Sequence, residues 1–132
     1  MSAVLDTHSV IWYLLRSTQL SPTALRAIRS AIDGGRPVFV SAISLVETIY
    51  LAESGRLPLE AWQRLNAAVK SSSSGIVIQP LDEGVSDAVY NVPRNIVSDM
   101  PDRIIAATAI HLGLPLITRD RRLQAAGIST IW

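Results

Sequence analysis

The chain has 132 residues and no long polar or low-complexity tract, so we predict one domain over residues 1–132, large enough to bury a single core. The net charge of +1 comes from 12 basic and 11 acidic residues, which gives no general indication of a nucleic-acid or membrane partner. The absence of cysteine excludes disulfides, zinc–thiolate sites and a thiol nucleophile. No apolar stretch approaches the roughly 20 residues that cross a bilayer, and we expect a cytoplasmic protein without a membrane partner.

The amino-terminal part of the chain alternates short apolar runs with amphipathic segments. Residues 3–5 form one such run, and the segment after Asp6 carries apolar residues at helical spacing. Ser21 followed by Pro22 is typical of a helix N-terminus, and Gly34 ends that helix. In chain order we predict a strand over 3–5, a helix over 9–16, a helix from Pro22 to the residue before Gly34, a buried strand over 37–41 and a helix over 42–53 that Gly55 closes.

The rest of the chain repeats this alternation. An amphipathic segment begins at Pro58, and the serine-rich turn over 71–75 ends it. Asp82 is a typical N-cap for the segment that runs through Tyr90, and Pro101 is typical of the first turn of a further helix. In chain order we predict a helix from Pro58 to the serine turn, a strand over 76–78, a helix capped by Asp82, a helix that begins at Pro101, and strands over 116–118 and 129–131.

Short, continuously apolar strands separated by helices are typical of a parallel sheet that helices cover on both faces, with right-handed crossovers. We therefore predict a three-layer α/β domain with about five strands in one parallel sheet, judged from the apolar runs. In such sheets the ligand-binding crevice lies beyond the carboxyl ends of the strands. The residues that directly follow each predicted strand are the first candidates for a functional site.

Three aspartates lie where the predicted elements would bring them to that edge. Asp6 follows the first strand, Asp120 follows the fourth, and Asp102 lies in the first turn of the helix that Pro101 begins. Each has a structural alternative, because aspartate is a favoured N-cap and complements the helix dipole. Three acids at the ends of converging elements favour a shared site over three separate caps.

Two further acids are candidates of different kinds. Glu47 lies inside the apolar helical segment over 44–50, where no cap explains it and where burial of a lone carboxylate is costly. The alternative is a surface position on an apolar helix. If this helix begins near Ala42, Glu47 lies in its second turn, within reach of the crevice. Asp99 is expected to cap the helix of Pro101, with an accessory contact to a metal ion or water as the alternative.

Four of these carboxylates would repel one another if they were brought together without a counterion. The four are those of Asp6, Glu47, Asp102 and Asp120, and a hard divalent cation would neutralise them. Mg²⁺ or Mn²⁺ suits oxygen ligands, activates water and stabilises charge in phosphoryl transfer. We therefore predict a metal-dependent enzyme that hydrolyses phosphodiester bonds. Attack by an activated water would leave a 5′-phosphate and a 3′-hydroxyl.

A basic patch lies beside the last of these acids. Arg119, Arg121 and Arg122 flank Asp120 in a chain that is otherwise almost neutral. Because arginine binds phosphate through paired hydrogen bonds, the patch favours contact with a nucleic-acid strand, and an ordinary solvated loop is the alternative. Arg103 could pair with an acid.

The neighbouring hydroxyl and aromatic residues are expected to have supporting roles. Thr7 and Thr118 are candidates for hydroxyls that orient the first and last aspartates of the four. We expect His8 and His111 to be non-catalytic. Trp12 is expected to pack or to support a dimer surface, and not to stack bases.

Four blocks of the sequence, spread over nearly the whole chain, each contain one of the four acids. The blocks over 4–8, 43–47, 102–109 and 116–120 read VLDTH, ISLVE, DRIIAATA and LITRD. Together they resemble the PIN-domain ribonucleases, and among them the VapC-type toxins of type II toxin–antitoxin systems. One departure lies at residues 99–102, which read DMPD where close relatives have Asp-Pro-Phe-Asp.

This resemblance implies a PIN-like fold with a five-stranded parallel sheet and a Mg²⁺- or Mn²⁺-dependent endoribonuclease. Asp6 and Asp102 match the acids expected to hold the metal most directly, and Glu47 and Asp120 match the rest of the quartet, acting directly or through water. Asp99 stands where some relatives have an additional acid. The resemblance also implies an RNA substrate, often a structured RNA such as tRNA, a VapB-like antitoxin partner and a homodimer.

Other functions fit the residues less well. An aspartyl-phosphate phosphatase would use Asp6 as its nucleophile but expects a second aspartate two residues later, where this chain has His8. Neither GxGxxG nor GxxxxGK[ST] is present, which argues against a nucleotide-binding loop. The alternative that stays open is a nuclease-inactive PIN-fold module that binds RNA or protein and whose acids serve only the structure.

Overall fold

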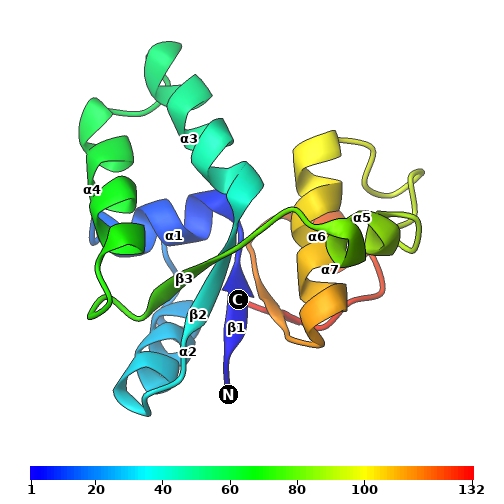
Figure 1. Cartoon of the computed structure of the whole chain (residues 1–132), viewed down its shortest axis with the longest axis horizontal. Coiled ribbons are helices and arrows are strands. Elements are labelled where there is room, and N and C mark those ends of the chain that lie inside the picture. The colour runs from blue at the N-terminus through cyan, green and yellow to red at the C-terminus, as the bar shows by residue number, and fades with distance from the viewer.

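Two helices follow each of the first three strands of the chain, and one short helix follows the fourth (Figure 1). The computed structural model describes all 132 residues and contains five strands and seven helices. In chain order the elements are β1 (Ala3–Leu5), α1 (Thr7–Leu14), α2 (Pro22–Asp33), β2 (Val38–Ser41), α3 (Ala42–Glu53), α4 (Leu59–Lys70), β3 (Ile76–Gln79), α5 (Glu83–Val89), α6 (Met100–Leu112), β4 (Leu116–Ile117), α7 (Arg121–Gln124) and β5 (Thr130–Ile131).

All five strands are parallel and form one sheet in the order β3-β2-β1-β4-β5. β1 lies in the centre, where Leu5 is in register with Val40 of β2 on one side and with Ile117 of β4 on the other. The chain moves outward from β1 through β2 to β3 and then returns to β4 on the other side of β1. The connection direction therefore reverses at the carboxyl ends of β1 and β4, the position at which open parallel sheets bind ligands.

Two hydrophobic cores, one on each face of the sheet, confirm the three-layer α/β prediction. Successive strand residues point to opposite faces, so Leu5 belongs to the core under α1, α2 and α4, whereas Val4 belongs to the core under α5, α6 and α7. Both residues are fully buried. In Figure 1 the two helical groups lie on opposite sides of the strands, and α3 rises from the carboxyl end of β2.

The helix boundaries follow the capping residues. The Ser21 side chain accepts a hydrogen bond from the Ala24 backbone N–H at 3.0 Å, and Asp82 accepts one from Val85 N–H at 2.9 Å, as the sequence predicts. Gly113 has φ of 65°, a left-handed conformation that glycine adopts without a Cβ clash. It ends α6 and turns the chain into β4.

The structure differs from the predicted elements mainly at the first helix and at one additional helix, and the other boundaries agree to within one residue. The first helix begins at Thr7, two residues before the predicted start, because Asp6 is its N-cap. The short helix α7 was not predicted, since four residues are too few to show helical periodicity in sequence. A helix long and apolar enough to span a membrane is not present.

Arg103 does not pair with an acid. Its guanidinium Nη2 donates to the backbone carbonyls of Val89 at 3.1 Å and Val92 at 3.0 Å, while its Nε is buried without a partner. These carbonyls lie at the end of α5 and in the segment just after it. Arg103 therefore ties α6 to the segment that follows α5 and is unavailable to the cleft described next.

Candidate active site

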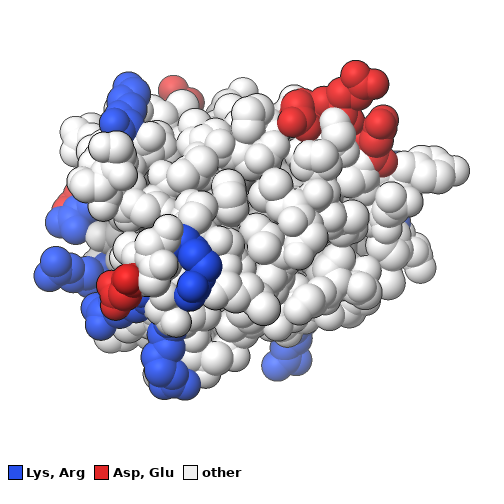
Figure 2. Space-filling view, turned by 60° about the horizontal axis from the view of Figure 1, so that its bottom comes forward, with Lys and Arg blue, Asp and Glu red and all other residues white.

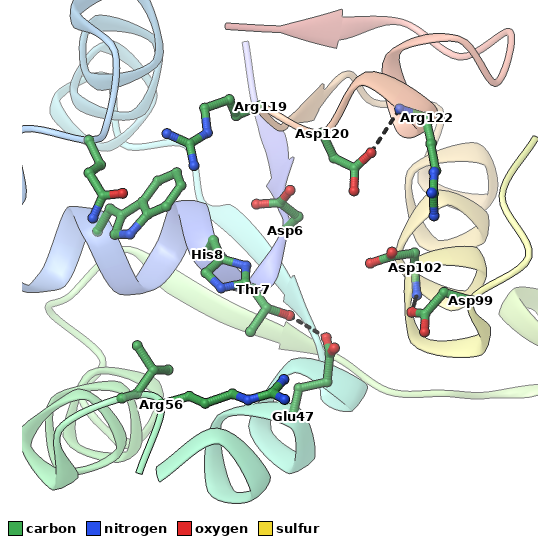
Figure 3. Close-up of a pocket in the computed structure, with 13 residues that line it drawn as sticks. Asp6, Thr7, His8, Glu47, Arg56, Asp99, Asp102, Arg119, Asp120 and Arg122 are labelled. Atoms are coloured by element: carbon green, nitrogen blue, oxygen red, sulfur yellow. Dashed lines mark hydrogen bonds between the residues drawn. The ribbon is translucent and has the colours of Figure 1, made fainter. Parts of the chain in front are cut away.

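A cleft of about 680 Å³ opens beyond the carboxyl ends of the central strands (Figure 3). Eleven of its 13 lining residues are polar or charged, since only two are hydrophobic. The cleft therefore lies where the connection direction reverses, at the carboxyl ends of β1 and β4. The lining includes all five acids that the sequence singled out, namely Asp6, Glu47, Asp99, Asp102 and Asp120.

Asp6 is the most rigidly held of these acids. It follows β1, is 8% exposed and caps α1 by accepting a hydrogen bond on Oδ1 from Ser9 N–H at 2.9 Å. Its Oδ2 accepts a hydrogen bond from Thr118 Oγ1 at 2.5 Å. Because each oxygen has a donor, the carboxylate is fixed in one orientation and keeps its second lone pairs for a cation.

Thr118 and Asp120 continue this hydrogen-bonded chain at the end of β4. Thr118 is fully buried, and its Oγ1 accepts a hydrogen bond from Asp120 N–H at 3.0 Å while donating to Asp6. Asp120 Oδ1 in turn caps α7, accepting from Arg122 N–H at 2.8 Å and Leu123 N–H at 3.4 Å. The predicted supporting role of Thr118 therefore has a geometric basis, because one hydroxyl touches both aspartates.

Glu47 enters the cleft from the second turn of α3, as the periodicity predicts. Thr7 Oγ1 donates to Glu47 Oε1 at 2.5 Å and lies 2.8 Å from Ser44 Oγ. The expectation that Thr7 orients an aspartate is wrong, because its place in the first turn of α1 turns the hydroxyl toward α3. Burial raises the pKa of Glu47, the bond from Thr7 lowers it, and the charge of Asp99 raises it again.

Asp99 and Asp102 form the opposite wall, at the N-terminus of α6. Asp99 caps the helix by accepting from Asp102 N–H at 3.2 Å, whereas no donor contacts the Asp102 carboxylate. Burial raises the pKa of Asp102 to about 7, followed by the negative charges of Asp99, Asp120, Glu47 and Asp6. The other four acids of the cleft are therefore close enough to Asp102 to raise the pKa of its carboxyl group.

The basic side chains around the cleft come from three separate segments. Arg119 and Arg122 line it from either side of the last aspartate, whereas Arg121 is not part of the lining. Arg56 also lines the cleft, from the connection between α3 and α4, and points toward the acids in Figure 3. Arg56 could not be singled out from the sequence, because no local motif marks it and its position depends on the packing of α3 against α4.

None of these cations neutralises the acids. The only salt bridge in the protein joins Arg64 to Glu60 at 2.7 Å, on the exposed surface of α4. Figure 2, which brings the lower side of Figure 1 forward, shows most of the basic groups of that face along its left and lower edges and a cluster of acidic groups at the upper right, with few charged side chains between them. The crowding of unpaired acids in the cleft is thus a feature of this site.

The donor set of the cleft suits a hard divalent cation. Carboxylate and hydroxyl oxygens are the ligands that Mg²⁺ and Mn²⁺ prefer, and a cation would remove the repulsion that raises the pKa of Asp102. No three of the acidic or histidine side chains are close enough to enclose one ion as they stand. Binding one ion through three of them therefore requires some of these side chains to move toward one another.

Comparison with known proteins places this geometry in a family. The sequence matches the PIN domain family over residues 3–128. It is 33% identical over 129 residues to Ribonuclease VapC22 of Mycobacterium tuberculosis, covering 94% of this chain and 91% of that protein.

Two solved structures share the fold over almost their whole length. VapBC2 from Rickettsia felis, bound to a DNA fragment from their promoter, superposes with a TM-score of 0.72 and 13% identity, covering 98% of this chain and 97% of that chain. A toxin–antitoxin complex from Klebsiella pneumoniae superposes with a TM-score of 0.66 and 23% identity, covering 98% and 96%. By its sequence match and its fold, the chain belongs to the PIN-domain family, as a VapC-type member.

Proposed function

We propose that this protein is a Mg²⁺- or Mn²⁺-dependent endoribonuclease and the toxin of a VapBC-type pair. The observation that carries the proposal is the group of five carboxylates that line one cleft without a basic partner at salt-bridge distance. Such a group is unfavourable unless a cation shares it. The ribonuclease relative at 33% identity supports RNA as the substrate.

In this proposal some of the acids bind the ion directly and others contact it directly or through water. Asp6 and Asp102 are its most direct ligands, one from each wall of the cleft. Glu47 and Asp120 complete the set directly or through water, and Asp99 adds a nearby charge. When bound, the ion would supply an activated water and stabilise charge on the phosphate.

The chain's own residues prepare the site for that chemistry. Thr118 and Thr7 hold Asp6 and Glu47 in fixed orientations, so these ligands need little reorganisation. The Asp102 carboxyl, with its pKa of about 7, is protonated in a large fraction of the molecules near neutral pH, and an ion must displace that proton. The affinity for the ion should therefore rise with pH through this range.

The substrate and partners follow from the surroundings of the acids. Arg56, Arg119 and Arg122 can contact phosphates of a strand that crosses the open cleft. We expect a VapB-like antitoxin to be the protein partner, supported by the toxin–antitoxin complex among the structural neighbours. A homodimer, a structured substrate such as tRNA and a cytoplasmic site of action belong to the same proposal.

The deciding experiment is cleavage of total RNA by the purified wild type and by Asp102→Asn, each with Mg²⁺, Mn²⁺ or excess EDTA. Wild type should cut only with metal, and Asp102→Asn should lose about a hundredfold or more of the rate, since even groups that only support a ligand cost 10- to 100-fold. Asp87→Asn is the matched control, because Asp87 is an exposed acid of α5 outside the cleft.

The products give an independent check on the route. Attack by water should leave a 5′-phosphate and a 3′-hydroxyl, whereas a 2′,3′-cyclic phosphate would mean that the RNA itself supplies the nucleophile. Cleavage that persists in EDTA would contradict the proposal. A folded wild type that binds RNA but cuts none with either metal would favour the nuclease-inactive binding module.

A further inference from the structure

His8 lines the cleft with its side chain exposed, although its sequence context predicts no role in the chemistry. Its ring packs on Trp12, one helical turn later on the same face of α1, with ring centroids 5.5 Å apart and planes tilted by 44°. No hydrogen bond or ion pair engages the imidazole. His8 therefore presents a flat, supported ring to the cleft.

Trp12 supports this part of the cleft from below, because both His8 and Arg119 pack on its ring. It belongs to the hydrophobic core and is only 8% exposed. His8, Trp132 and Arg119 also pack on it, with the Trp132 ring centroid 6.0 Å away. The Arg119 guanidinium carbon lies 4.6 Å from the centre of the Trp12 ring. Trp12 is too covered to stack a ligand itself, and its effect is to hold His8 and Arg119 in place.

Arg119 brings a second kind of group to the same wall. It is exposed and lines the cleft, and its guanidinium makes no salt bridge or hydrogen bond within the protein. Its five N–H donors are therefore available, in the planar arrangement that matches a phosphate. Figure 3 shows His8 and Arg119 on either side of the approach to Asp6.

We propose that His8 and Arg119, supported by Trp12, form a subsite for one unpaired nucleotide beside the scissile phosphate. The base stacks on the His8 imidazole, and the adjoining phosphate contacts the Arg119 guanidinium. Stacking on a side chain requires a base that has left its helix, so the subsite selects unpaired over paired RNA and tolerates all four bases. This inference rests on the proposed ribonuclease function and adds a reason for its choice of substrate.

The test measures binding separately from cleavage. All variants carry Asp102→Asn, and the probe is a short, labelled, single-stranded oligoribonucleotide of mixed sequence, followed by fluorescence anisotropy and compared with the same strand in a duplex. His8→Ala should raise the Kd for the single strand about tenfold and leave the Kd for the duplex unchanged. His8→Tyr should restore single-strand binding, because a phenol ring also stacks.

His111→Ala is the matched control, since His111 is the other histidine, is exposed at the far end of α6 and does not line the cleft. Single-strand binding that is unchanged in His8→Ala, or that His8→Tyr fails to restore, would overturn the subsite. If wild type and the single variant His8→Ala cleave RNA with metal at the same rate, the subsite is overturned and the nuclease is not. His8-dependent binding with no cleavage by wild type would support the subsite and overturn the nuclease.

Discussion

The two walls of the cleft hold the same kind of side chain in opposite ways. On the β1 wall, formed by Asp6, Thr118 and Asp120, every carboxylate accepts at least one hydrogen bond from the protein. On the α6 wall, formed by Asp99 and Asp102, Asp99 accepts one from Asp102 N–H, whereas the Asp102 carboxylate accepts none and its pKa rises to about 7. One wall is preorganised, and the other is under electrostatic strain.

This difference shows how a small protein can hold several acids together without a counterion. Hydrogen bonds from backbone N–H groups and hydroxyls stabilise the charged form of a carboxylate, so Asp6 contributes to folding even without metal. Asp102 instead relieves repulsion by keeping a proton near neutral pH. The β1 wall would then supply ready ligands, while the α6 wall would respond to the ion.

The largest expected effect is the difference in free energy of unfolding between Asp6→Ala and Asp102→Ala. Loss of Asp6 removes the N-cap of α1 and leaves the buried N–H of Ser9 unpaired, so the free energy of unfolding should fall by about 2 kcal/mol. Asp102→Ala breaks no hydrogen bond of its side chain and should not destabilise the metal-free protein. Urea denaturation in EDTA measures both, and Asp6→Asn should recover most of the loss. Equal destabilisation by the two alanines would remove the distinction between the walls.

Thr118→Val should disable the β1 wall without removing an acid. Valine has nearly the same shape, but it leaves Asp6 Oδ2 and the Asp120 N–H without the partner they share. We expect metal-dependent cleavage to fall about tenfold, as for other residues that orient a metal ligand. Thr118→Ser should restore the rate because it keeps the hydroxyl. A fully active Thr118→Val protein would show that the orientation of Asp6 does not limit the reaction.

The acids of both walls could be predicted because their positions depend on local rules. A residue that closely follows a parallel strand lies near the carboxyl edge of the sheet, and Asp6 directly follows β1 while Asp120 comes shortly after β4. Glu47 stood out because an acid in an apolar helix without a capping role needs another explanation. The strand and helix alternation needed for both arguments was visible in sequence.

The contacts between elements could not be predicted in the same way. Arg56 reaches the cleft through the α3–α4 connection, and the direction of a connection depends on how its two helices pack. The partner of Thr7 depends on which face of α1 turns toward α3, so sequence spacing alone suggested an aspartate where the structure has Glu47. The packing of the His8 ring on Trp12 is likewise a contact that no sequence motif indicates.

The pH dependence of stability should reveal the raised pKa of Asp102 on the α6 wall. Because the pKa of Asp102 rises from 3.8 in the unfolded chain to about 7, the folded protein binds more protons between these values and loses stability as the pH rises through them. Asp102→Asn cannot titrate at this position. In EDTA the melting temperature of Asp102→Asn should equal that of wild type below pH 3.8 and should be a few degrees higher above pH 7.

Thermal melts across this pH range, with Asp87→Asn as the exposed control, test the expectation. Saturating Mg²⁺ should remove the advantage of Asp102→Asn, because wild type alone gains the stabilisation of binding. An advantage for Asp102→Asn that is the same at low and high pH would assign the effect to packing and not to charge.

The smallest expected effect concerns the arginines at the rim of the two walls. Arg119→Gln and Arg122→Gln each remove a cation that lines the cleft, whereas Arg121→Gln removes a neighbouring cation that does not. Each of the first two should weaken RNA binding a few-fold and reduce the slope of log Kd against log salt by about one. Arg121→Gln should bind as wild type does, although the sequence offers no reason to separate it from its neighbours. If all three lose affinity equally, the strand follows the surface of α7, and the walls of the cleft do not define its path.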